Sequence, residues 1–230
     1  MIHAQSIIKY YGIGESRFQA LRGIDLYIAK GESAVILGAS GSGKSTLLNI
    51  LSGLERPDGG NVFYGDEDIT TLSDSALTRF RRDNIGFVFQ QYYLLSGMTV
   101  EKNVRMGADL ASNSDYIDII KAVGLGEKLE KYPSQLSGGE QQRVAIARAI
   151  AKKPKVLFAD EPTGALDEST GRQVLNFMLK LQSELGFTLI MVTHNSNIAQ
   201  TAKTVIKMNS GRIESVTKND SIKTAFEIGW

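Results

Sequence analysis

A glycine-rich stretch from Gly38 to Thr46 holds the residues whose types and spacing point most directly to chemistry. It fits the phosphate-binding pattern G-x-x-x-x-G-K-[ST], in which backbone N–H groups converge on a phosphate because no Cβ blocks the approach. Lys44 can reach the β- and γ-phosphates of a nucleotide, and the Ser45 hydroxyl can ligate Mg²⁺. The apolar run 34–37 before the loop and the helical pattern 47–51 after it disfavour a flexible linker. The loop residues are Gly38, Ala39, Ser40, Gly41, Ser42, Gly43, Lys44, Ser45 and Thr46.

Two adjacent carboxylates, Asp160 and Glu161, follow a continuous apolar run at residues 155–159 that is typical of a central parallel strand. An aspartate at such a strand end, beside a phosphate loop, is suited to the Mg²⁺ shell. If Glu161 continues the strand, it points the other way and can hold an attacking water rather than the metal. The alternative, a solvated acidic turn, is disfavoured by the phosphate loop in the same chain.

Three more candidate side chains lie near the ends of predicted strands. His194 follows the apolar run 188–192, where it could donate to a γ-phosphate or be an ordinary surface or packed histidine. Tyr10 and Tyr11 come after the first predicted strand, residues 2–8. Adjacent aromatics on an extended chain face opposite sides, so at most one should line a given site, and a packed aromatic is the simpler alternative.

A second anion site is expected just before the predicted helix 144–152. Ser137 offers a cap hydroxyl, and Gly138 and Gly139 leave backbone N–H groups exposed at a helix N-terminus. Since one phosphate loop already serves a nucleotide, a second site indicates that the nucleotide of another copy of the chain is clamped here. The alternative is an ordinary serine N-cap.

The composition excludes several classes of function. The chain has 230 residues, 42% hydrophobic and 22% charged, with a formal net charge of +1, so no global field favours nucleic acid as a partner. The absence of cysteine removes disulfides, thiolate metal sites and cysteine nucleophiles. No apolar stretch approaches the roughly 18–20 residues that cross a bilayer, and residues 1–5 lack signal-peptide features. We expect a soluble, cytoplasmic chain whose membrane role, if any, needs a partner.

The elements that must position these residues alternate between strands and helices, which predicts an α/β fold with a parallel sheet and its ligand at the carboxyl ends of the strands. Residues 92–131 show helical spacing without a convincing strand and form a predicted insertion. From residue 217 to 230 no pattern is clear, and whether Phe226 and Trp230 dock on the domain or on a partner stays open. Further strands are expected at 24–29, 61–64, 85–89, 205–208 and 212–216, and further helices at 70–82 and 169–185.

Taken in order, these motifs resemble those of the ATP-binding-cassette (ABC) ATPase family over nearly the whole chain. Leu136–Gln141 resembles the family signature, with Glu140 where glutamine is the common residue. Gly38–Thr46 resembles Walker A, and Val156–Asp160 resembles Walker B. The other matches are Gln90 with the Q-loop glutamine, Asp167 with the D-loop, His194 with the switch histidine, and Tyr11 (or, as a second choice, Tyr10) with the aromatic that stacks on adenine.

For the fold, the resemblance implies a P-loop ATPase core with a mostly parallel sheet, an N-terminal antiparallel β subdomain and an α-helical subdomain inserted at about 92–150. It implies one nucleotide-binding domain over residues 1–230, with a tail at about 217–230. For the activity, it implies hydrolysis of ATP by a homodimer that forms when ATP binds. The implied catalytic residues are Lys44, Glu161 and His194.

The resemblance also implies how ligands are shared. Mg²⁺ would be held by Ser45 and Gln90, with Asp160 acting through a water. Each ATP would lie between the Walker motifs of one subunit and the signature of the other. The signature residues that would act on the other subunit's ATP are Ser137, Gly138, Gly139 and Gln141.

Finer features resemble one branch of the family, the macrolide-exporter, lipoprotein-release and bacitracin-type peptide-resistance ATPases. These features are residues 18–23, 85–91 and 160–167. The branch implies peripheral attachment at the cytoplasmic face of the membrane, a permease of four transmembrane helices and an extracytoplasmic partner, with antimicrobial peptide, drug, haem or lipoprotein as cargo. An amino-acid-type importer and a cell-division ATPase remain alternatives. Translation and repair members are disfavoured by the single signature and the lack of cysteine.

Overall fold

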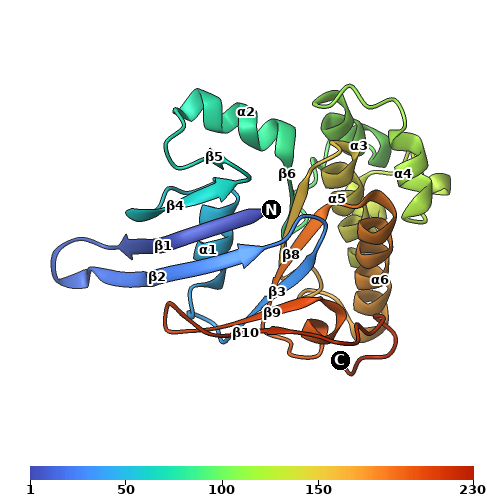
Figure 1. Ribbon diagram of the computed structural model, residues 1–230. Helices are drawn as coiled ribbons and strands as arrows, with labels where there is room; N and C mark the ends of the chain where they lie inside the picture. The colour runs from blue at the N-terminus through green and yellow to red at the C-terminus, as the bar shows by residue number, and fades with distance from the viewer.

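Two sheets organise the molecule, and the computed structural model describes all residues from 1 to 230 (Figure 1). The larger sheet has six strands in the order β10-β9-β3-β8-β7-β6. All of its pairings are parallel except β9 with β10, which form the predicted hairpin. Its strands are β3 (Ser33–Leu37), β6 (Ile85–Val88), β7 (Val156–Asp160), β8 (Thr188–Thr193), β9 (Thr204–Asn209) and β10 (Arg212–Lys218).

The smaller sheet is antiparallel and has the order β2-β1-β4-β5. Its strands are β1 (Ile2–Tyr11), β2 (Phe18–Ile28), β4 (Gly59–Tyr64) and β5 (Glu67–Asp68). Helix α1 (Lys44–Leu51) contributes Leu47, Leu48, Ile50 and Leu51 to the hydrophobic core that joins the two sheets. The phosphate loop is therefore supported by apolar contacts from both sheets.

Helices cover the other face of the larger sheet. Their apolar side chains and those of β7 and β8 form a second core, and every residue of β8 is buried, as expected for a central parallel strand. These helices are α3 (Val100–Asp109), α4 (Tyr116–Ala122), α5 (Gly138–Ala151) and α6 (Glu168–Leu185). Helix α2 (Asp74–Asn84) instead contributes Leu77 and Phe80 to the first core. Four short 3₁₀ turns lie at Gly14–Ser16, Gly126–Lys128, Pro133–Gln135 and Ile198–Thr201.

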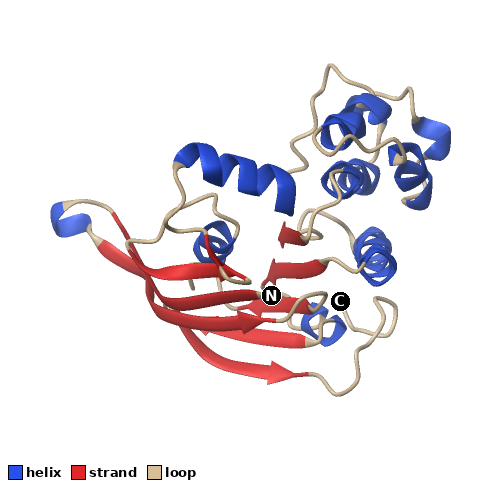
Figure 2. Ribbon diagram, turned by 45° about the horizontal axis from the view of Figure 1, so that its top comes forward, coloured by secondary structure: helices blue, strands red, loops and turns tan.

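The segment 92–150 contains helices and 3₁₀ turns and no strand, and its helices gather beside the sheets (Figures 1 and 2). The predicted α/β class with an antiparallel N-terminal sheet and a helical insertion is confirmed. No helix of the molecule combines the length and apolar character that spanning a bilayer requires.

Several predicted boundaries were wrong. The first strand continues to Tyr11, so Tyr10 and Tyr11 lie inside it and not after it. The second strand begins at Phe18 and not at residue 24. Residues 18–22 are polar in part, but they pair with residues 8–11 of the first strand in a long hairpin. The helix expected from residue 70 begins at Asp74, where Ser73 provides the N-cap. The helix expected from residue 144 begins at Gly138, directly after Ser137.

Candidate functional site

The phosphate loop connects β3 to α1, as predicted. Gly41 and Gly43 have φ of 76° and 98°, a region that favours glycine, and Gly43 leads directly into the first turn of α1. Lys44 is 7% exposed, and its Nζ donates to the Ala39 carbonyl at 2.9 Å across the loop. A methyl group at Gly38 would lie 2.4 Å from the Met208 carbonyl oxygen, so the loop packs tightly against β9.

Two of the three metal residues expected from the sequence, Ser45 and Asp160, lie close together at the start of α1 and the end of β7. The Ser45 hydroxyl donates to Asp160 Oδ1 at 3.3 Å. Burial raises the pKa of Asp160, and the neighbouring charge of Glu161 raises it further, against the opposing effects of the Ser45 hydrogen bond and Lys44. The molecule has no cluster of three His, Cys, Asp or Glu side chains that could hold a metal ion.

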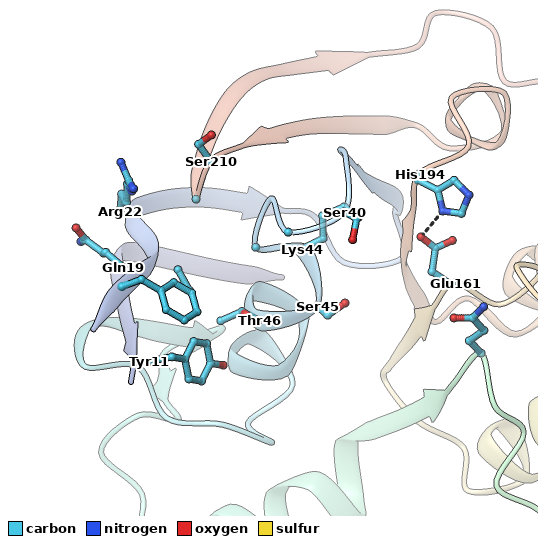
Figure 3. A pocket seen from close by; sticks show the side chains of 16 residues that line it. Tyr11, Gln19, Arg22, Ser40, Lys44, Ser45, Thr46, Glu161, His194 and Ser210 are labelled. Atoms are coloured by element: carbon cyan, nitrogen blue, oxygen red, sulfur yellow. Dashed lines mark hydrogen bonds and ion pairs between the residues drawn. The ribbon is translucent and has the colours of Figure 1, made fainter. Parts of the chain in front are cut away.

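Glu161 and His194 form a hydrogen-bonded pair past the ends of β7 and β8, 2.8 Å apart between Oε1 and Nδ1 (Figure 3). Glu161 does not continue the strand. Its φ is 47°, and its backbone N–H donates to the Val192 carbonyl of β8 at 2.9 Å. This left-handed conformation is uncommon for a residue with a side chain, and such conformations concentrate at functional sites. The side chain of Glu161 is 17% exposed and that of His194 68% exposed.

A cavity of about 970 Å³ brings these groups together (Figure 3). Its polar end is formed by the loop residues, by Gln90 at the end of β6, and by Glu161 and His194. The predicted site residues that line it are Tyr11, Ser40, Gly41, Gly43, Lys44, Ser45, Thr46, Gln90, Glu161 and His194.

The other end of the cavity is aromatic. Tyr11 lines it, and its hydroxyl donates to Glu55 at 2.6 Å, whereas Tyr10 does not line it and packs under Arg17, 4.2 Å from ring centroid to guanidinium. Phe18 lies 5.8 Å from Tyr11 between ring centroids. Burial and the hydrogen bond to Glu55 raise the pKa of Tyr11.

Several lining residues were missed by the sequence interpretation: Phe18, Gln19, Ala20, Arg22, Ser210 and Gly211. They come from two distant hairpins that meet over the loop, where the Arg22 N–H donates to the Gly211 carbonyl at 2.9 Å. The Asn-Ser-Gly turn at 209–211 was a usable signal for a hairpin, but nothing in the sequence placed that hairpin beside residues 18–22.

The second predicted anion site does not line this cavity. Ser137, Gly138, Gly139, Gln141 and Asp167 all lie outside it. Ser137 caps α5 in a capping box with Glu140, so the simpler N-cap interpretation is satisfied as well. Hydrogen bonds from Lys128 and from the Ser137 backbone lower the pKa of Glu140.

Asp167, the predicted D-loop residue, caps α6. It accepts from the Thr170 N–H at 3.1 Å, and hydrogen bonds from Thr170 lower its pKa. The signature and Asp167 therefore both lie at helix N-termini, outside the cavity that the phosphate loop, Glu161 and His194 line.

Comparison with known proteins identifies relatives of this chain. The ABC transporter family model matches residues 21–164. The lipoprotein-releasing system ATP-binding protein LolD of Geobacter metallireducens is 43% identical over 219 residues, covering 93% of this chain and 97% of LolD. A putative ABC transporter ATP-binding protein of Mycoplasma pneumoniae is 43% identical over the whole chain, which spans 50% of that relative. The macrolide export ATP-binding/permease protein MacB of Wolinella succinogenes is 41% identical, and the match covers 93% of this chain and 34% of MacB.

The dimeric structure of the ATP-binding cassette MJ0796, in a post-hydrolysis state bound to ADP and Pi, superposes with a TM-score of 0.85 at 38% identity, covering 96% of this chain and all of that one. The motifs, the fold and these relatives agree. The chain therefore belongs to the ABC transporter ATP-binding family, and LolD and MacB are among its relatives.

Proposed function

We propose that this chain binds and hydrolyses ATP to power an export-type ABC transporter. The observation that carries the proposal is the single cavity in which the phosphate loop faces Glu161 and His194. The similarity to LolD and MacB supports the export direction.

In this proposal ATP lies along the cavity from its aromatic end to its polar end. Tyr11 stacks on the adenine, since an aromatic face binds a base by stacking. The loop N–H groups and the N-terminus of α1 hold the phosphates, and Lys44 exchanges its contact with Ala39 for the β- and γ-phosphates.

Mg²⁺ fits the oxygen donors at the polar end of the cavity. A serine hydroxyl, a glutamine amide oxygen and a carboxylate are the hard ligands that this ion prefers, and waters complete its shell. Ser45 and Gln90 would hold the ion, with Asp160 acting through a water. The ion would offset charge on the phosphates.

Glu161 and His194 carry out the proton chemistry in the proposal. Glu161 accepts a proton from the attacking water as a general base. In this proposal His194 acts as an imidazolium, whose Nδ1–H donates to the Glu161 carboxylate and whose Nε2–H donates to the γ-phosphate, so the two side chains orient the water and the phosphate together.

The working unit is proposed to be a homodimer with two shared nucleotides. Ser137, Gly138, Gly139 and Gln141 lie outside the cavity, and in this arrangement they contact the ATP of the other subunit. Asp167 lies beside the shared interface. Binding of the γ-phosphate closes the dimer, and hydrolysis removes the contact that holds it closed.

The partner is proposed to be a membrane permease of the four-helix type, with an extracytoplasmic protein beyond it and this chain attached at the cytoplasmic face. Antimicrobial peptide, drug, haem or lipoprotein are the cargo classes that the branch implies. Specificity for the cargo would reside in the permease, since this chain contributes the nucleotide site.

The test begins with Glu161→Gln, which keeps the shape of the side chain and removes the base. With ATP the variant should elute as a dimer in size-exclusion chromatography with light scattering, whereas the wild type returns to monomer as it hydrolyses ATP. Glu67→Gln, an exposed glutamate on β5, is the matched control and should behave as wild type. A Glu161→Gln chain that hydrolyses ATP at the wild-type rate would contradict the proposal.

The same variant then identifies the partner. Glu161→Gln purified from native membranes with ATP should carry a four-helix permease with a large extracytoplasmic domain, detected by mass spectrometry. Recovery of a permease with a substrate-binding protein typical of importers would overturn the export direction and leave the ATPase assignment intact.

A further inference from the structure

A buried glutamine outside the nucleotide cavity joins three segments that the proposed reaction uses. Gln142 lies on α5, next to the signature, and is 0% exposed. Its Nε2 donates to the Phe89 carbonyl at 3.3 Å and to the Pro162 carbonyl at 2.7 Å. Phe89 directly precedes Gln90, and Pro162 directly follows Glu161. One side chain of the signature helix therefore contacts the backbone beside two residues of the nucleotide cavity.

The two contacts fix the orientation of the amide. Carbonyl oxygens only accept hydrogen bonds, so both hydrogens of Nε2 are used and Oε1 faces elsewhere. Oε1 is buried and has no hydrogen-bond partner in the protein. An unpaired buried acceptor is unfavourable, so Gln142 holds its two carbonyls at a cost in stability. Two donated bonds kept beside an unpaired acceptor are expected of a side chain that holds the Phe89 and Pro162 carbonyls at a fixed separation.

A second side chain of α5 holds the far end of the same loop. The guanidinium of Arg148 donates to the Tyr93 carbonyl at 2.7 Å and to the Tyr92 carbonyl at 2.9 Å. Residues 89–93, which include Gln90, are thus bound to α5 at both ends. The loop and the signature helix form one body, and within this set only Gln142 also reaches the strand end that carries Glu161.

We propose that Gln142 is a positioning residue for ATP hydrolysis, which ties the loop 89–93 and the signature helix to the backbone that orients Glu161. The inference rests on the role of Glu161 proposed above. Gln142 does not line the nucleotide cavity and acts through Pro162. A shift of the loop or of α5 is transmitted to Glu161 through this amide, and a displacement of about 1 Å at a catalytic group can cost on the order of a hundredfold in rate.

The test compares isosteric variants of Gln142 with a matched buried amide. Gln142→Met keeps the length of the side chain and removes both donors, and Gln142→Glu keeps the shape and replaces the donors with acceptors. Asn113→Ala is the control, because Asn113 is 5% exposed and donates to the Ala151 carbonyl at the other end of α5, at 2.8 Å. Steady-state ATPase kinetics and thermal unfolding are measured for all four chains.

We expect both Gln142 variants to lose on the order of tenfold to a hundredfold in kcat, with KM for ATP changed by less than about threefold. Asn113→Ala should lose stability while keeping kcat and KM. A kcat loss in Gln142→Met no larger than that of Asn113→Ala, or a rise in KM that accounts for the whole defect, would overturn the inference. Failure of the wild type to hydrolyse ATP would instead overturn the proposed function, so the two failures are distinguishable.

Discussion

At the scale of single residues, Tyr10 and Tyr11 show how one step along a strand decides which side chain faces the ligand. Alternation in a strand predicts that only one of the two lines the site. The register of β1 against β2 shifts between Lys9 and Tyr10, so counting from the start of the strand does not reveal which one. The structure brings Tyr11 to Glu55 and the cavity, and packs Tyr10 under Arg17 on the other side.

Replacing Tyr11 with alanine should weaken ATP binding by about tenfold, because stacking of a base on an aromatic ring contributes roughly 1–3 kcal/mol. Titration of a fluorescent ATP analogue measures the change. Tyr11→Phe keeps the ring, loses the hydroxyl contact with Glu55, and should retain most of the affinity. Tyr10→Ala is the matched control, and an equal loss of affinity in that variant would contradict the assignment of Tyr11.

The catalytic end of the cavity shows what sequence can reveal at this scale. Spacing alone brings Lys44, Ser45 and Asp160 to one place, because a phosphate loop and a neighbouring strand end have fixed geometry. The backbone of Glu161 was not predictable in the same way. Its left-handed conformation accompanies a hydrogen bond from its N–H to the carbonyl of Val192 on another strand, and no local pattern in the sequence indicates that contact.

At the scale of elements, the segment 219–230 docks on α6 of its own domain. Ala225 and Ile228 are buried in the core under α6, and Arg172 donates to both of their carbonyls. The ring of Trp230 covers Gly171, where a methyl group would lie 2.2 Å from the indole. The sequence left open whether this segment meets the domain or a partner, because its apolar residues lack a regular period.

Trp230→Ala should lower the free energy of unfolding by about 2 kcal/mol, roughly half the cost at a fully buried tryptophan. Urea denaturation followed by circular dichroism measures it. Phe226→Ala is the matched aromatic control on the same segment; Phe226 is 59% exposed, so its loss should change stability by less than about 0.5 kcal/mol. Equal effects of the two substitutions would mean that the docking contributes nothing.

At the scale of the whole molecule, we proposed above that the nucleotide site is shared between two copies of the chain. The phosphate loop, Gln90, Glu161 and His194 share the cavity, whereas the signature begins α5 outside it. Two anion-binding segments in one chain predicted this sharing, which stays a prediction. The sequence could not predict the aromatic end of the cavity as completely, because Phe18 and Gly211 meet only after two hairpins from opposite ends of the chain fold together.

The proposed sharing predicts complementation between two inactive chains. Lys44→Ala disables the phosphate loop, and Ser137→Arg places a bulky cation at the start of the signature helix, so each homodimer alone should lack ATPase activity. In a mixed dimer one shared site has both defects and the other has none, because the intact loop of one chain faces the intact signature of the other. Mixing the purified variants should therefore restore ATPase activity, while mixing either with Glu161→Gln/Lys44→Ala/Ser137→Arg should not. If both halves of the site belonged to the same chain, every mixture would stay inactive, since each chain would carry its own defect into its own site.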